Sequence, residues 1–123
     1  MSKSRVLIVD DEPDMLDCLV EVLSQQFDIS VARSGLEALV ELRGRDFDAV
    51  VLDLKMACVD GFDVLSYLST RKPKTKVLIA SGLPSLDRIA QRYGATDWLP
   101  KPYHLDVLEE RVARLVGEDP GPR

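Results

Sequence analysis

The sequence contains few of the residues that build thiolate metal sites, disulfides or membrane spans. Its 123 residues include two cysteines, Cys18 and Cys58, and a single histidine, with no CxxC pair and no Cys/His cluster. So few potential cysteine and histidine ligands disfavour a zinc site. We interpret the two cysteines as reduced thiols of a cytoplasmic protein. The apolar runs are far shorter than the roughly 20 residues that a membrane-spanning helix needs.

An export signal and an excess of positive charge are also missing. Residues 1–5 lead at once into a short apolar run that ends in acids, without the apolar stretch and small-residue cleavage site of a signal peptide. A formal net charge of −5 disfavours nonspecific contact between this domain and nucleic acid. The length of 123 residues fits one domain with one core.

Short apolar runs alternate with amphipathic segments five times along the chain. Such runs are typical of buried strands in a parallel sheet, and the predicted strands are Arg5–Asp10, Ile29–Ala32, Ala49–Asp53, Lys76–Ala80 and Thr96–Leu99. Regular alternation implies right-handed crossovers with helices on both faces of the sheet. A closed barrel of eight units needs roughly 250 residues, so we predict an open, doubly wound α/β sheet.

Each predicted helix has a recognisable start, end or apolar face. The first begins near Pro13, the second opens on a capping box from Ser34 to Glu37 and breaks at Gly44, and the third follows Asp60-Gly61 and ends before Pro73. The fourth is predicted over about Ser85–Tyr93 and the fifth over about His104–Val116, with His104 as a weak cap. In the second helix we expect Leu36, Leu39 and Val40 to be buried.

Polar groups follow four of the predicted strands at the point where each ends. They are Asp10, Asp11 and Glu12 after the first, Asp53 after the third, Ser81 and Gly82 after the fourth, and Lys101 after the fifth. In open parallel sheets, ligands bind outside the carboxyl ends of the strands, so these groups should converge. Clustered carboxylates repel unless a cation lies among them, and Mg²⁺ is the usual solution. A hydroxyl and an ammonium suggest a phosphoryl group.

Each of these residues also has a simpler interpretation. Asp10, Asp11 and Glu12 would merely cap the following helix, where acids interact favourably with the helix dipole. Ser81 would be a helix cap or a loop serine, and Lys101 would be a solvated lysine. The simpler interpretation fails to explain Asp53, which ends a separate strand. A carboxylate can attack phosphorus to give an aspartyl phosphate, Lys101 could pair with the phosphoryl oxygens, and Gly82 would let the backbone approach closely.

The chain resembles bacterial response-regulator receiver domains of the CheY type over nearly its whole length. The segments that carry the resemblance are Val6–Glu12, Val51–Met56 with Asp60-Gly61, Leu78–Gly82 and Gly94–Pro102. The resemblance implies a flavodoxin-like (βα)5 sheet in the strand order 2-1-3-4-5. It also implies a receiver domain, which we place at residues 1–117, and a cis bond between Lys101 and Pro102. The composition of residues 118–123 predicts a linker-like tail.

The resemblance assigns a role to each matching residue. Asp53 would be the phosphoacceptor, and Asp10 and Asp11 the acidic pair, with Asp11 as the expected direct Mg²⁺ ligand. The backbone carbonyl of Lys55 would be a further ligand. Ser81 would be the switch hydroxyl, Lys101 would pair with the phosphate, and the aromatic residue on the fifth strand, Trp98, would follow Ser81 inward.

Two positions depart from the family pattern. On the fifth strand this chain has Trp98 where the family usually has Tyr or Phe. The larger indole would hinder an inward swing in a densely packed interior. The alternative is a static, partly buried Trp98 side chain. The proline that usually follows the loop methionine is replaced by Ala57, which adds backbone freedom to a ligand loop.

The implied function is a phosphorylation-activated switch of a two-component system, not an enzyme beyond its own phosphotransfer and dephosphorylation. Its partners would be a sensor histidine kinase or phosphotransfer protein and a downstream effector domain or partner protein, and phosphorylation could drive homodimerisation. Nucleic acid and membranes are not expected partners of this domain. A phosphate-independent interaction module stays as the alternative. An aspartyl-phosphate phosphatase is disfavoured, because Lys55 stands where such enzymes need a second acid.

Overall fold

A computed structural model describes residues 3–54 and 61–117 of the chain and has five strands and five helices in strict alternation. The strands are β1 Arg5–Val9, β2 Asp28–Ala32, β3 Ala49–Leu52, β4 Lys76–Ser81 and β5 Asp97–Pro100. The helices are α1 Pro13–Leu23, α2 Gly35–Gly44, α3 Gly61–Arg71, α4 Leu86–Tyr93 and α5 Leu105–Leu115. The ends of the predicted elements agree with these bounds to within about a residue.

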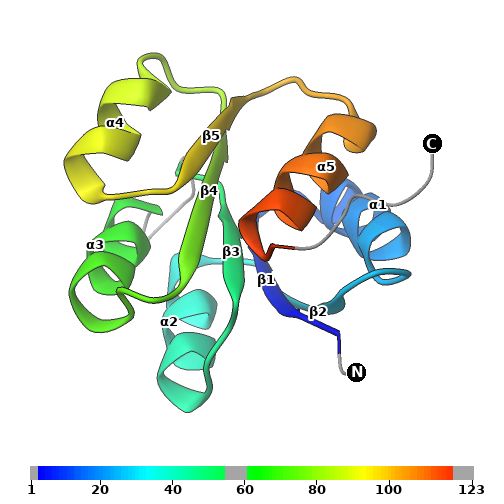
Figure 1. Ribbon diagram of the computed structural model, residues 1–123, viewed down its shortest axis with the longest axis horizontal. Coiled ribbons are helices and arrows are strands. Elements are labelled where there is room, and N and C mark those ends of the chain that lie inside the picture. Colours follow the sequence, from blue (N-terminus) through cyan, green and yellow to red (C-terminus); the bar gives the residue numbers. More distant parts are fainter. Residues whose placement is uncertain (1–2, 55–60, 118–123) are drawn as a thin grey trace.

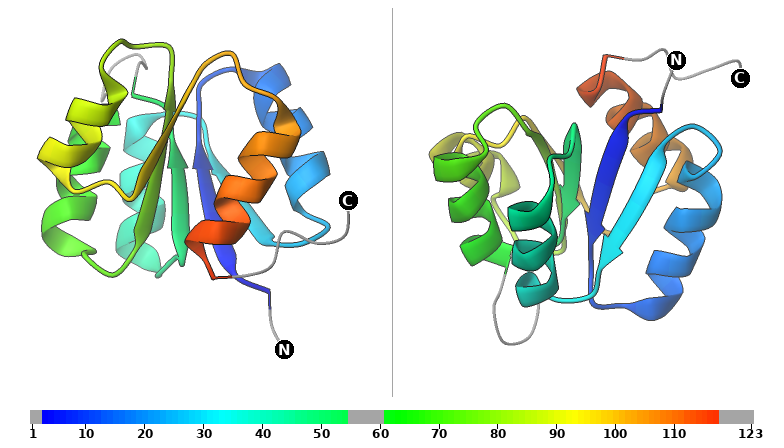
Figure 2. Two further views of the ribbon diagram at one scale, coloured as in Figure 1. Left: turned by 45° about the horizontal axis from the view of Figure 1, so that its top comes forward. Right: turned by 90° about the horizontal axis from the view of Figure 1, so that it is seen from below.

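The strands form one parallel sheet in the order β2-β1-β3-β4-β5, which confirms the predicted fold class. Figures 1 and 2 show α1 and α5 against one face of the sheet and α2, α3 and α4 against the other. All five strands run the same way, so their carboxyl ends lie along one edge of the sheet.

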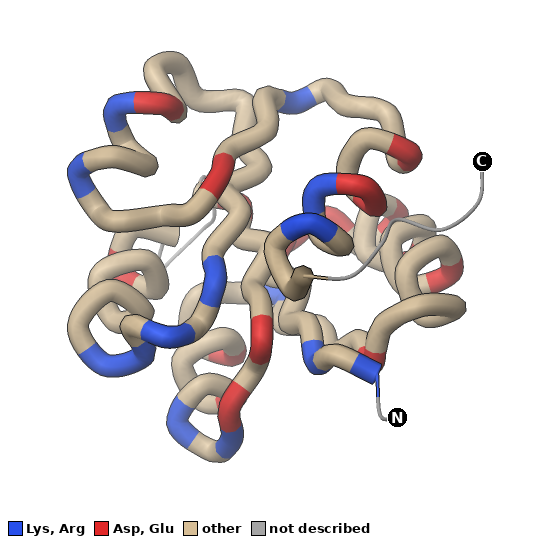
Figure 3. Tube along the Cα trace, viewed as in Figure 1, with Lys and Arg blue, Asp and Glu red and all other residues tan. Residues whose placement is uncertain are grey.

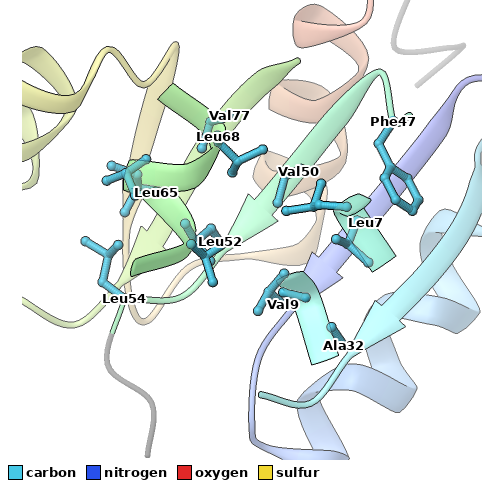
Figure 4. Packing of buried hydrophobic residues seen from close by; sticks show 14 of the residues in the cluster. Leu7, Val9, Ala32, Phe47, Val50, Leu52, Leu54, Leu65, Leu68 and Val77 are labelled. Carbon is cyan, nitrogen blue, oxygen red and sulfur yellow. The ribbon is translucent and has the colours of Figure 1, made fainter. Parts of the chain in front are cut away.

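The core is divided by the sheet into two layers, because successive strand side chains point to opposite faces. Leu7, Val9, Val50 and Leu52 pack with α2, α3 and α4, as Figure 4 shows from close by. Their neighbours along the strands pack on the other face, with α1 and α5. Every residue of β3 is buried, which explains why its sequence is apolar without alternation.

The predicted buried face of α2 is wrong at two of its three residues, because only Leu39 packs against the core, where it is partly buried. Leu36 and Val40 are 61% and 64% exposed, whereas the buried residues are Gly35, Ala38 and Leu42. Apolar residues occur on both the buried and the exposed sides of α2, so their spacing alone does not indicate the buried side. The helix starts at the cap residue Ser34, whose hydroxyl accepts a hydrogen bond from the Glu37 N–H at 3.1 Å. The buried residues include the small Gly35 and Ala38.

Candidate functional site

Two acids stand at the ends of neighbouring central strands. Asp10 follows β1 and its N–H donates to the carbonyl of Ala32 at 3.1 Å, while Asp53 follows β3 and its N–H donates to the carbonyl of Val9 at 3.0 Å. These bonds continue the sheet ladder one residue beyond each strand. The backbone of both acids is therefore fixed by the sheet, and both residues are buried, at 3% and 7% exposure.

Asp11 completes a cluster of three carboxylates. One oxygen atom from each of Asp10, Asp11 and Asp53 lies within 4.8 Å of the others, and Asp11 is the exposed member. Asp10 Oδ1 also accepts a hydrogen bond from the Glu12 N–H at 3.0 Å, which ties this carboxylate to the start of α1. Three hard oxygen donors at this spacing fit a small divalent cation such as Mg²⁺, which prefers carboxylate and water oxygens.

Lys101 brings positive charge to the same place. Its Nζ lies 2.7 Å from Asp10 Oδ2 and 3.2 Å from Asp53 Oδ2. Burial alone would lower the pKa of Lys101, but the hydrogen bond to Asp10 and the charge of Asp53 outweigh it, so this pKa lies above its ordinary value. Lys101 is thus a firmly protonated ammonium that holds two carboxylates of different strands.

The backbone around Lys101 links β5 to the end of β4. The Lys101 N–H donates to the carbonyl of Ser81 at 2.9 Å, and the Lys101–Pro102 bond is cis, as the resemblance implies. Ser81 is the last residue of β4 and is fully buried. Its Oγ accepts the Leu83 N–H at 3.2 Å.

Trp98 lies on β5 and is 40% exposed, so it stands outside the acid cluster. Its backbone N–H donates to the Asp97 carboxylate at 2.8 Å, and its carbonyl accepts from Arg111 of α5 at 3.3 Å. Arg111 also forms an ion pair with Asp97 at 3.0 Å. Arg111 of α5 is therefore bonded both to the Trp98 carbonyl and to the side chain of the preceding residue.

Several predicted residues lie outside the described residues or contribute little. The Lys55 carbonyl, Ala57 and Cys58 belong to residues 55–60, outside the described part of the chain. His104 stands at the cap of α5 without a side-chain capping bond, as predicted. A Cβ built on Gly82 would meet no described atom within 4 Å, so packing of the described residues does not require glycine there.

Tyr103 is a neighbour of the site that the sequence did not single out. Its hydroxyl lies 3.9 Å from Met15 Sδ in the first turns of α1. Burial raises the pKa of the Tyr103 phenol, the positive charge of Lys101 opposes that rise, and the nearby carboxylates add to it. The contact joins the segment that carries Lys101 to the helix that follows Asp11. The only signal in the sequence is the position of Tyr103, two residues after Lys101.

Comparison with known proteins adds independent observations. The family described as "Response regulator receiver domain" matches residues 6–113. The transcriptional regulatory protein TcrA of Mycobacterium tuberculosis is 36% identical over 126 aligned positions, covering 100% of this chain and 50% of that protein. The response regulator protein PilR of Pseudomonas aeruginosa is 36% identical over 119 positions, covering 94% of this chain and 27% of PilR. The chain thus spans half or less of these relatives.

Solved structures show the same architecture. The non-phosphorylated HemR receiver domain from Leptospira biflexa has a TM-score of 0.86 and 28% identity, with 98% of this chain and 99% of that chain covered. The receiver domain of the Francisella response regulator 1452 has a TM-score of 0.85 and 30% identity, covering 93% and 97% of the two chains.

Among the described residues, no helix is long and apolar enough to cross a membrane.

Proposed function

Because the chain belongs to the response regulator receiver domains of two-component signalling, we propose that Asp53 is its phosphoacceptor. The observation that carries this proposal is the meeting of three carboxylates and one ammonium from three strand ends. Burying several charges together is costly unless they are paired.

The proposed reaction is transfer of a phosphoryl group from phosphohistidine. An oxygen of the Asp53 carboxylate attacks phosphorus, the N–P bond breaks, and the imidazole leaves with the bonding electrons and takes up a proton. Asp53 then carries an acyl phosphate. Lys101, already 3.2 Å from Asp53 Oδ2, would pair with the phosphoryl oxygens. Little other chemistry is required, because positioning and charge stabilisation carry phosphoryl transfer.

Asp10, Asp11 and Asp53 would hold Mg²⁺, together with the carbonyl of Lys55 that the resemblance implies. When bound, this ion would neutralise negative charge on the phosphoryl oxygens. Asp10 is held by both Lys101 and the Glu12 N–H, whereas Asp11 is exposed at the rim. This difference supports Asp11 as the more direct ligand and Asp10 as the group that orients Lys101.

The proposed response to phosphorylation passes through Ser81. The buried Ser81 hydroxyl would donate to a phosphoryl oxygen, and Trp98 would move toward the space that Ser81 leaves. The surface formed by α4, β5 and α5 would then change. Such a response is a shift between two states, which the phosphoryl group biases only through its different contacts in each state.

The proposed partners follow from this chemistry. A sensor histidine kinase or phosphotransfer protein would supply the phosphoryl group, and an effector domain or separate protein would bind the altered surface, with a phosphorylation-dependent homodimer as one form of output. Residues 118–123 would serve as a linker-like tail.

Intact-mass spectrometry after incubation with acetyl phosphate tests the proposal. With Mg²⁺ we expect the mass of one added phosphoryl group, and with EDTA none. Asp11→Asn should require a higher Mg²⁺ concentration for the same yield. Failure to form an adduct from both acetyl phosphate and a phosphohistidine protein would contradict the proposal and favour the phosphate-independent interaction module.

A further inference from the structure

Gly61, the first residue of α3, lies directly against the backbone that carries Asp53. A Cβ built on Gly61 would stand 2.3 Å from Leu54 Cα, 2.4 Å from the Asp53 carbonyl oxygen and 3.0 Å from the Asp53 carbonyl carbon. Real Cβ atoms essentially never approach other heavy atoms more closely than 3.0 Å. All three neighbours are backbone atoms, so a change of side-chain rotamer cannot relieve the contact.

The same two backbone segments are also joined by a hydrogen bond. The Gly61 N–H donates to the carbonyl of Leu54 at 3.1 Å. The start of α3 is therefore bonded to the residue that follows Asp53, across the span from 54 to 61.

Neither partner in this contact can move away freely. The Asp53 N–H is bonded to the carbonyl of Val9, and Leu54 is 1% exposed. On the other side, α3 is fixed in the core by Val64, Leu65 and Leu68, as Figure 4 shows for the last two. A side chain at position 61 would have to displace the Asp53–Leu54 peptide or the first turn of α3.

We propose that Gly61 is a positioning residue that sets the place of the Asp53 carboxylate relative to Lys101 and Asp10. This inference rests on the proposed function, because it assigns Gly61 a part in the phosphoryl transfer at Asp53. Asp53 Oδ2 lies only 3.2 Å from Lys101 Nζ, so a displaced peptide would lengthen or misalign this contact. Misplacement of reacting groups by about 1 Å can lower a rate by about a hundredfold.

Gly61→Ala tests the inference, with Gly44→Ala as the matched control. Gly44 is the last residue of α2, and a Cβ there would meet nothing within 4 Å. The folded fraction is measured by circular dichroism and urea titration, and the rate of phosphoryl gain at saturating acetyl phosphate and Mg²⁺ is divided by that fraction. We expect a rate at least about tenfold lower for Gly61→Ala and an unchanged rate for Gly44→Ala.

A purely structural role would give fewer folded molecules that react at the normal rate. An unchanged rate per folded molecule in Gly61→Ala would therefore overturn the inference. If this variant is largely unfolded, both variants and the wild type are compared in trimethylamine N-oxide, which favours the compact state. A rate that stays low after refolding supports positioning, and a restored rate refutes it.

The failure of this inference and that of the proposed function are distinguishable. If the wild type gains no phosphoryl group from either acetyl phosphate or a phosphohistidine protein, the proposed function fails. The Gly61 inference is then decided by calorimetric titration with Mg²⁺ alone. A weaker affinity in Gly61→Ala than in the wild type and Gly44→Ala would support displacement of Asp53, and equal affinities would refute it.

Discussion

The two ends of the sheet differ in how they hold charge. At the amino end, concavities of 590 and 690 Å³ are lined by loops rich in cations, with Arg71, Lys72, Lys74 and Lys76 around the first and Lys3 and Arg5 in the second. Figure 3 shows Lys and Arg positions, in blue, on several separate segments of the trace. At the carboxyl end, Asp10, Asp53 and Lys101 are brought together with little exposure.

The comparison teaches that shape alone does not locate the functional site. Lys72 and Asp46 form an ion pair of 2.7 Å at the amino end, but the Asp46 side chain is 88% exposed, and exposed pairs contribute little. The Lys101–Asp10 pair has the same length, with the Asp10 side chain 5% exposed. Charges withdrawn from water in this way are a sign of chemistry, because a purely structural role would be served as well by apolar residues.

The largest contrast is expected between Asp53 and Asp48, which stand just after and just before β3. Asp53→Asn should abolish the phosphoryl adduct, because the nucleophilic carboxylate is gone. Asp48→Asn should leave it unchanged, since the Asp48 carboxylate accepts the Arg5 N–H at 2.8 Å at the opposite end of the sheet. Intact mass after incubation with acetyl phosphate measures both. An adduct that survives in Asp53→Asn and disappears in Asp48→Asn would contradict the assignment of Asp53 as the phosphoacceptor.

Lys101→Met should slow phosphoryl gain by about a hundredfold, the effect typical of losing one preorganised charge donor. Lys76→Met, at the amino end of β4, is the control and should have no effect on this rate. The initial rate of adduct formation at fixed Mg²⁺ compares the two. Equal rates in the two lysine variants would remove Lys101 from the mechanism.

The hydroxyls of Ser81 and Thr75, at the two ends of β4, are expected to have different roles, one in the response to phosphorylation and one in stability. Ser81→Ala should still gain the phosphoryl group but lose the accompanying change in Trp98 fluorescence. Thr75→Ala should keep that change and cost about 1 kcal/mol of unfolding free energy, because the Thr75 hydroxyl donates to the carbonyl of Phe47 at 3.2 Å. A full fluorescence response in Ser81→Ala would exclude Ser81 as the link.

Alkaline pH should weaken the carboxyl end selectively. The pKa values of Lys101 and Tyr103 are raised in the folded protein. Their stabilising contribution is complete below the unfolded values of about 10.4 for lysine and about 10 for tyrosine, and it is lost as pH rises through the folded values. Urea unfolding between neutral pH and this range should show a smaller alkaline loss in Lys101→Met than in the wild type. Identical losses would contradict the prediction.

The smallest effect is expected at the exposed pair of the amino end. The hydrogen bond from Lys72 and then its charge lower the pKa of Asp46, so this pair stabilises the fold above the unfolded pKa of Asp46, and that contribution is lost as pH falls through the folded value. Full solvent exposure screens it. Lys72→Ala should therefore leave the dependence of the unfolding free energy on acidic pH unchanged within error. A clear change in that dependence would show that the Lys72–Asp46 pair stabilises the fold more than an exposed pair should.

The sequence predicted the strands and the acidic edge well, for a physical reason. A strand buried on both faces must be apolar throughout, so the first polar residue after it marks its carboxyl end, as at Asp10 and Asp53. The helix faces were harder. In α2 apolar residues occur on both the buried and the exposed sides, so their spacing does not indicate which side packs on the core.

The parts of the site that the sequence left open depend on distances between segments far apart in the chain. Tyr103 meets Met15 only after α5 and α1 pack side by side. Gly61 belongs to the Asp60-Gly61 motif, but its close approach to the Asp53 carbonyl oxygen is visible only in the folded structure. Neither contact has a periodic or spacing signal, because each is set by how two elements approach one another.

The most direct test of the central claim is to locate the phosphoryl group within the chain. Sodium borohydride reduces an aspartyl phosphate to homoserine, which peptide mass spectrometry identifies by position. After treatment with acetyl phosphate and Mg²⁺, we predict homoserine at position 53 and at no other acid. Homoserine at Asp48 or Asp46, or its absence from a protein that has gained the phosphoryl mass, would contradict the assignment of the carboxyl end as the phosphoacceptor site.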